Sequence, residues 1–186
     1  MHQAAKTAAV ALMEIDADMN ILTSEGEIVT TADEFMENCS AVIIPAFIVD
    51  SEEEAVALAQ YFDARYIVDA FVVASSENAS LVKTVRAACP TVRGALIFDD
   101  LSTDAARKEA RALVHDNVSY IAIYDGLLDI DAITYFNARQ VAVWCYANDT
   151  ADVYTSIANG YNGVIAADAS TVYGVYESIT ETTVSG

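Results

Sequence analysis

The segment 140–168 reads QVAVWCYANDTADVYTSIANGYNGVIAAD and predicts a complete strand, helix and strand. Its first apolar run, 141–146, is rich in β-branched and aromatic residues, as buried strands are. Cap-type residues follow at 148–150, and Asn159-Gly160 is a typical helix end because Gly adopts the left-handed conformation at little cost. The second apolar run, 163–167, leads into Asp168. Two buried strands joined through a helix predict a parallel sheet.

The same alternation runs through the rest of the chain and gives about seven βα units. Further strands are expected at 8–15, 41–49, 66–74, 94–98 and 118–124, with a short hairpin at 21–29. This pattern fits either a TIM-type (β/α) barrel or an open doubly wound sheet. No Gly-rich phosphate loop follows the first strand, so nothing positive supports a nucleotide-binding sheet. A full barrel has eight strands, so we predict an α/β fold of the barrel type that is short or incomplete.

The length of 186 residues suits one domain, which we place at 1–182, with 183–186 as a tail or linker stub. Pro45 interrupts the strand at 41–49, where we expect a bulge or an unpaired backbone group. The last helix is expected from 169 to about 182.

The composition excludes some classes of partner. The chain carries 28 acids against 9 bases, a net charge of −19. Nucleic acids and anionic membrane surfaces need basic patches, so neither is an expected partner. An acidic surface favours solubility and fits a divalent cation, although most charge in proteins is simply solvated surface.

Cysteine usage and hydropathy restrict the chain further. Cys39, Cys89 and Cys145 are odd in number and far apart, which predicts buried thiols rather than a disulfide framework or a zinc site. No apolar run is long enough to span a membrane, so membrane insertion is not expected. The start, MHQAAKTAAVALM, lacks the regions of a signal peptide. We expect a soluble protein, and the sequence indicates no particular compartment.

Polar and aromatic side chains follow the predicted strands, at the end where parallel α/β folds carry their working groups. The candidates for a mouth or ligand site are Asp50, Asp99, Asp125, Trp144, Tyr146, Asp149 and Asp168. The acids also occupy helix-cap positions, so each has a structural explanation as well. None of the nine bases follows the carboxyl end of a strand. A phosphodiester would therefore meet like charge there unless a metal intervened.

The opening segment resembles the late part of the glycerophosphodiester phosphodiesterase family, whose members are (β/α) barrels of the phospholipase-C-like superfamily. The matching pieces are VAVWCYAND at 141–149 and IANGYNGVIAADAS at 157–170, against a V-x-V-W strand, an N-D helix start and a G-x-x-G-I-I-T-D strand. TTADEFMENC at 30–39 and VVASSENASLVKTVRAACP at 72–90 are similar to earlier pieces. The resemblance covers about 28–176 and implies a barrel with phosphodiesterase ancestry.

The family's catalytic pattern is mostly missing. Its members open with a His-Arg-Gly strand whose His works with a second His, whereas this chain has only His2 at its start and His115 in a predicted helix. Glu14-Ile15-Asp16 has the spacing of the family's E-x-D metal motif, so the resemblance implies Glu14 and Asp16 as candidate ligands of Ca²⁺ or Mg²⁺. Ala32 precedes Asp33 where the family has His, and Ile44–Phe47 replaces its I-E-x-K strand. We therefore assign no catalytic residue.

Three functional hypotheses follow. The leading one is a phosphodiesterase-like pseudoenzyme, related to enzymes of lipid metabolism, that serves as an accessory or interaction domain. The second is an active metal-dependent phosphoric diester hydrolase acting on glycerophosphodiesters. The third is a small-ligand or carbohydrate-binding barrel with Trp144, Tyr146 and Tyr124 as a stacking rim, unless Trp144 simply fills the core.

A short barrel also leaves an open edge between its first and last strands. Open edges need cover, so we expect a homo-oligomer or an adjoining domain there.

Overall fold

The computed structural model describes residues 10–39, 43–117, 119–124, 126, 128–167 and 170–175. The strands in this part are β1 (Val10–Ile15), β2 (Asn20–Leu22), β3 (Ile28–Thr31), β4 (Ile44–Ile48), β5 (Phe71–Ser75), β6 (Arg93–Phe98), β7 (Ile121–Tyr124), β8 (Ala142–Tyr146) and β9 (Gly163–Ile165). The helices are α1 (Ala32–Cys39), α2 (Glu52–Arg65), α3 (Ala79–Ala88), α4 (Asp104–Asp116), α5 (Ile130–Asn137) and α6 (Thr150–Asn159). Residues 170–175 are helical too.

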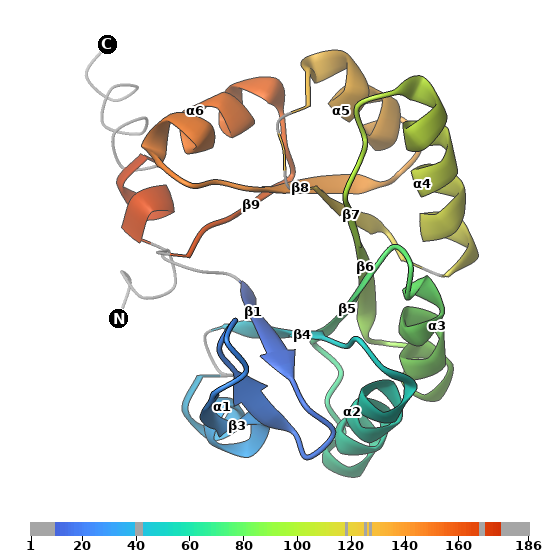
Figure 1. Cartoon of the computed structure of the whole chain (residues 1–186), viewed down its shortest axis with the longest axis vertical. Helices are drawn as coiled ribbons and strands as arrows, with labels where there is room; N and C mark the ends of the chain where they lie inside the picture. Colours follow the sequence, from blue (N-terminus) through green and yellow to red (C-terminus); the bar gives the residue numbers. More distant parts are fainter. Residues whose placement is uncertain are drawn as a thin grey trace.

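All these strands form one sheet in the order β3-β2-β1-β4-β5-β6-β7-β8-β9. β1 and β4 to β9 are parallel and follow one another in chain order, whereas β2 and β3 are an antiparallel addition. A doubly wound sheet reverses its strand order, and this one does not. Figure 1 shows the sheet curled, with its helices outside and the ring open between β9 and β1. The prediction of a short or incomplete TIM-type barrel of about seven βα units is confirmed.

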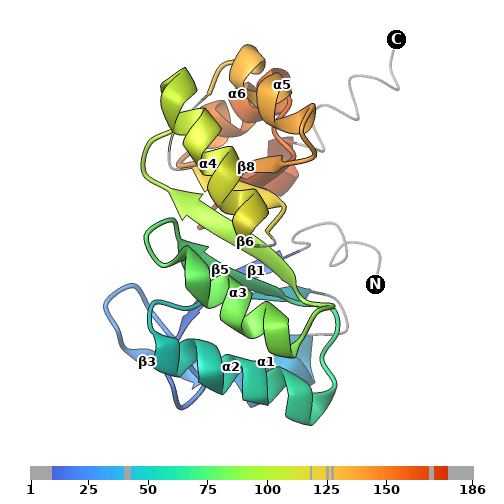
Figure 2. The same ribbon diagram turned by 90° about the vertical axis from the view of Figure 1, so that its right-hand side faces the viewer.

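Two apolar layers hold this architecture, because successive side chains of a strand point to opposite faces. Inside the curled sheet, Phe71 and Ile123 belong to a buried cluster. Between the sheet and the helices lies a larger cluster, in which Phe47, Phe62 and Phe136 are almost fully buried. α2 and α3 pack side by side over this outer layer (Figure 2). The helices therefore fix the positions of the loops at the strand ends.

Local sequence signals set the helix ends. Ser51 and Glu54 form a capping box at the start of α2, and Thr103, Asp129 and Asp149 each accept a backbone hydrogen bond at a helix start. Gly160 ends α6 with a φ of 85°, as its position after Asn159 predicts. These caps lie in the loops that follow the strands.

Two details differ from the predictions. The strand expected from residue 66 begins only at Phe71, because Tyr66 adopts the left-handed conformation and closes α2. Pro45 causes no bulge, since β4 keeps an unbroken register with β1. Pairing with β5 starts at Ala46, so Pro45 precedes that ladder.

Some expectations fall outside the described residues: the beginning of the first strand, the last helix beyond residue 175 and the side chain of Cys39. Cys89 and Cys145 are free and buried, as predicted. None of the helices in the described part of the chain combines the length and the apolar character needed to cross a membrane.

Candidate functional site at the carboxyl ends of the strands

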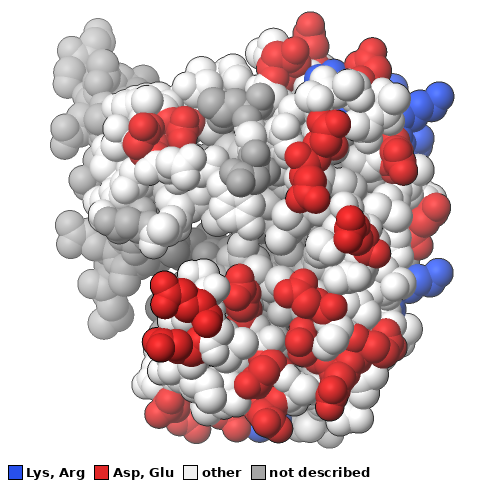
Figure 3. All heavy atoms as spheres, in the orientation of Figure 1, with Lys and Arg blue, Asp and Glu red and all other residues white. Residues whose placement is uncertain are grey.

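The carboxyl ends of the parallel strands form an acidic face. Figure 3 views this face and shows Asp and Glu side chains spread over it, with Lys and Arg gathered near its rim. Such a field attracts cations and repels anions. The predicted site residues are therefore considered one loop at a time.

Glu14 and Asp16 lie in different settings at the end of β1. Glu14 is exposed, and it follows the inward-facing Leu12 by two residues, so it stands on the barrel side of the strand. Asp16 closes the turn to β2. Its Oδ1 accepts hydrogen bonds from the backbone N–H groups of Asp18 at 3.0 Å and Asn20 at 2.9 Å, and its Oδ2 accepts from Asn20 Nδ2 at 2.9 Å.

These bonds, led by the one from the Asn20 side chain, lower the pKa of Asp16 below its usual value. A carboxylate has about four acceptor positions, and the turn uses three of them. Over the described ranges, no group of three or more His, Cys, Asp and Glu side chains is placed to hold a metal ion. The Ca²⁺ or Mg²⁺ site at Glu14 and Asp16 stays a prediction.

The other acids lie in separate loops. Asp50 is exposed after β4, where its N–H donates to Glu54 Oε2 at 2.7 Å and its carbonyl accepts from Asn78 Nδ2 at 3.1 Å. Asp99 is exposed after β6. Asp149 caps α6, accepting from the N–H groups of Ala151 and Asp152 at 2.8 and 3.0 Å. Asp125 and Asp168 are not among the described residues.

Trp144 and Tyr146 face the barrel interior from β8. The indole of Trp144 meets the ring of Phe71 edge-on, with 5.5 Å between the ring centroids. It also lies against Gly163 of β9, where an added Cβ would come within 2.6 Å of the indole. Gly163 is therefore required for Trp144 to occupy this position. Both aromatic side chains remain partly exposed.

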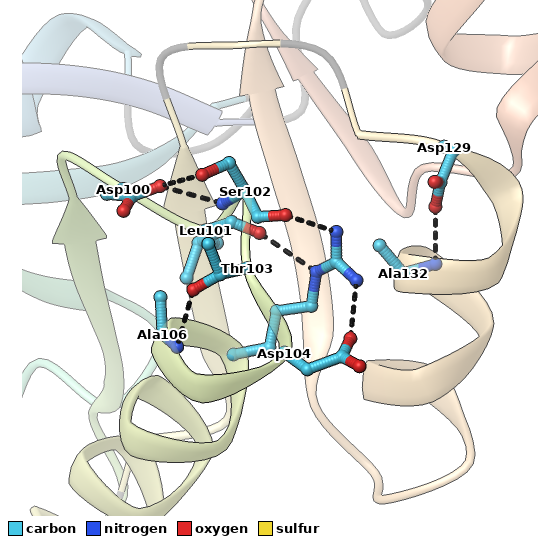
Figure 4. A network of polar contacts seen from close by, with 9 residues as sticks. Asp100, Leu101, Ser102, Thr103, Asp104, Ala106, Asp129 and Ala132 are labelled. Atoms are coloured by element: carbon cyan, nitrogen blue, oxygen red, sulfur yellow. Dashed lines mark hydrogen bonds and ion pairs between the residues drawn. The ribbon is translucent and has the colours of Figure 1, made fainter.

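The loop after β6 contains contacts that the sequence did not reveal. Ser102 donates from its N–H and its hydroxyl to Asp100 Oδ1, at 2.7 and 2.6 Å, which lowers the pKa of Asp100 (Figure 4). Arg107 reaches back from α4 to the same loop. Its Nε donates to the carbonyl of Leu101 and its Nη2 to that of Ser102, both at 2.9 Å.

A cation therefore does lie beside the acidic face, contrary to what the positions of the bases indicate. The sequence could have indicated this position of Arg107, because long side chains in a helix lean toward the helix start, and α4 starts at the loop after β6. Arg107 Nη1 also donates to Asp104 of α4 at 3.1 Å, so each of the three guanidinium nitrogens contacts a group of the loop or of α4.

The loop after β7 is held by Tyr161. Its hydroxyl accepts from the N–H of Leu128 at 2.5 Å and donates to the carbonyl of Gly126 at 3.2 Å. Asn159 Nδ2 donates to the carbonyl of Leu128 at 2.9 Å. Burial raises the pKa of Tyr161 to about 12, so it is a neutral anchor rather than a proton carrier at neutral pH.

His115 takes no part in this arrangement. His115 is exposed near the end of α4, with its Nδ1 3.7 Å from an oxygen of Asp116. Helices of a βα unit run back from the carboxyl ends of the strands, so the end of α4 lies at the opposite side of the barrel. His2 lies outside the described residues.

Comparison with solved structures shows which known proteins share this fold. A phosphodiesterase from Oleispira antarctica, solved with the product sn-glycerol-3-phosphate, matches with a TM-score of 0.72 and 12% identity over 96% of this chain and 88% of that one. The Agrobacterium tumefaciens glycerophosphodiester phosphodiesterase matches with a TM-score of 0.68 and 11% identity, over 95% and 90% of the two chains. The chain shares its fold with the glycerophosphodiester phosphodiesterases.

The likeness is one of architecture. An oxaloacetate acetylhydrolase also matches, with a TM-score of 0.54 and 13% identity over 83% of this chain and 63% of that one. No protein-family model and no curated protein sequence matches the chain. Barrels of one architecture carry many chemistries, so function must be argued from the side chains.

Proposed function

We propose that this chain is a glycerophosphodiester phosphodiesterase-like barrel domain that does not hydrolyse phosphodiesters and serves as an accessory or interaction domain. The phosphodiesterase fold and the late sequence pieces at 141–149 and 157–170 support the scaffold. The setting of Asp16 is the observation that carries the loss of catalysis. Three of its roughly four acceptor positions are used by the turn before β2, which leaves little of the carboxylate for a metal.

The charge of the face supports the same proposal. A phosphodiester is an anion, and a phosphodiester bound at the candidate site would lie near the carboxylates of Glu14, Asp50 and Asp99. Arg107 is close, but its guanidinium is engaged with the carbonyls of Leu101 and Ser102. Like charge at short range opposes binding unless a cation intervenes. The competing function is therefore a metal-dependent hydrolase, and metal addition is the decisive variable.

The test is hydrolysis of glycerophosphodiesters by the purified chain, with Ca²⁺ or Mg²⁺ added and with chelator. We expect no release of glycerol 3-phosphate above the rate without protein. Metal-dependent release that disappears in Glu14→Gln, and survives in Glu25→Gln, would establish the hydrolase and refute the proposal. Glu25 is the matched control because it is an exposed acid in the turn between β2 and β3 and is not one of the candidate residues at the carboxyl ends of the parallel strands.

A further inference from the structure

Within the described residues, the sheet leaves a gap between β9 and β1 where a full barrel would have one more parallel strand. β9 pairs with β8 alone, so its other edge carries unpaired backbone groups among the described residues. On the opening side of β1, β2 pairs with Glu14 and Ile15 alone. The stretch Val10–Met13 therefore has its ladder on the β4 side only, within the same ranges. The two backbone edges that face the opening, on β9 and on Val10–Met13 of β1, both belong to parallel strands. The described part of the chain has seven parallel strands, one short of a full barrel.

Several inward-facing side chains on the strands that border the opening are more exposed than most of those on the strands opposite. On the strands opposite, Phe71 and Val73 of β5 and Ile123 of β7 are at most 3% exposed, whereas Ile97 of β6 is partly buried. The inward side chains nearest the opening are only partly buried, namely Val10, Leu12, Ala142, Trp144, Tyr146 and Ile165. The opening therefore uncovers apolar interior surface as well as backbone groups.

We propose that this opening binds one extended segment of a partner protein, which runs parallel to β1 and β9 and completes the barrel. Strand addition of this kind takes affinity from main-chain hydrogen bonds and specificity from alternate side chains. The segment needs about four residues to match Val10–Met13, with apolar side chains at the inward positions beside Leu12 and Ile165. The proposal does not depend on the absence of catalysis.

Charge decides against a second copy of the chain as the occupant. Each copy carries a net charge of −19, and two such copies repel one another. A neutral or basic segment meets no such penalty. The free edge of β3 is a weaker acceptor, because its register shifts opposite Ile21 and Leu22 and such irregularities protect edges.

The test uses a synthetic peptide, Lys-Lys-Val-Ala-Val-Ala-Val-Lys-Lys, with the full chain. Hydrogen exchange of the amides of residues 10–13 and 163–165 and the fluorescence of Trp144 report binding. With the peptide at ten times its dissociation constant, we expect exchange at both edges to slow about tenfold. A peptide N-methylated at alternate residues keeps the side chains but loses backbone donors, and should have no effect.

Two further controls locate the binding. Ile28→Lys, on the exposed edge strand β3, should leave the response unchanged. A Glu-flanked peptide should bind more weakly at low salt. The proposal fails if the peptide gives no saturable response or if the N-methylated peptide acts equally. It also fails if the amides at both edges are already protected from exchange in the chain without peptide, whether sedimentation shows that chain to be a monomer or a dimer.

Discussion

Replacing Arg107 by Met tests whether this side chain organises the loop after β6. The aliphatic stem is kept and the guanidinium is lost, together with its bonds to the carbonyls of Leu101 and Ser102. The side chain of Arg107 is 15% exposed and Leu101 is fully buried, so water replaces the bond to Leu101 poorly. The bond to the exposed Ser102 is replaced more easily.

The expected cost follows from these settings. A hydrogen bond from a charged donor contributes about 1.5–3 kcal/mol, and the bond to Leu101 accounts for most of the loss. The pair with the fully exposed Asp104 side chain adds only about 0–1 kcal/mol. Arg107→Met should therefore lower the free energy of unfolding by about 2–3 kcal/mol. With an m-value of roughly 2 kcal/mol/M, the urea midpoint should fall by about 1–1.5 M.

Equilibrium urea unfolding, followed by circular dichroism, measures this loss. Arg111→Met is the matched control, because Arg111 is exposed on the same helix and should change stability by no more than about 0.5 kcal/mol. Arg107→Lys keeps the charge but not the planar fork, and should lie between the two. The reasoning is refuted if Arg107→Met and Arg111→Met unfold at the same urea concentration with unchanged m.

Two other predictions concern titrating groups. Tyr161→Phe should cost about 1–2 kcal/mol near neutral pH by removing the bonds to Leu128 and Gly126. Because the pKa of Tyr161 is raised to about 12, wild-type stability should fall as pH rises from about 10 to 12, and urea unfolding of the Phe variant should lack that fall. Arg65, and then Tyr61, lower the pKa of Asp33, so its contribution is present above about pH 4 and lost as pH falls through the lowered value. Thermal melts of Asp33→Asn between about pH 2 and 5 should show a flatter acid limb, and an unchanged limb contradicts this.

The scaffold could be predicted because its signals are local. The apolar run at 141–146, the Asp149 cap and Gly160 each determine a strand, a helix start or a helix end through neighbouring residues. Repeating such units in one order leaves few topologies to choose from. The wrongly predicted strand start at Tyr66 shows how far such local patterns can be trusted for element bounds, since an apolar run can include a residue that only closes the preceding helix.

The candidate site was less predictable because it depends on the reach of side chains between elements. Arg107 stands inside a helix in the sequence, and only the folded α4 brings its guanidinium to Leu101. Tyr161 reaches Leu128 across 33 residues, a separation that no local pattern encodes. Asp16 carries the spacing of a metal motif, but the turn to Asn20 determines what its oxygens contact.

β1 links the two proposals and allows them to fail separately. Val10–Met13 borders the opening in the barrel, and Glu14 and Asp16 stand at the carboxyl end of the same strand. A segment that pairs with Val10–Met13 would run toward these two carboxylates and end next to Glu14, because β2 already pairs with Glu14 and Ile15. Hydrolysis must accordingly be measured with and without the bound peptide. Metal-dependent activity that appears only with the peptide would refute the loss of catalysis while supporting strand addition, and binding without activity would support both.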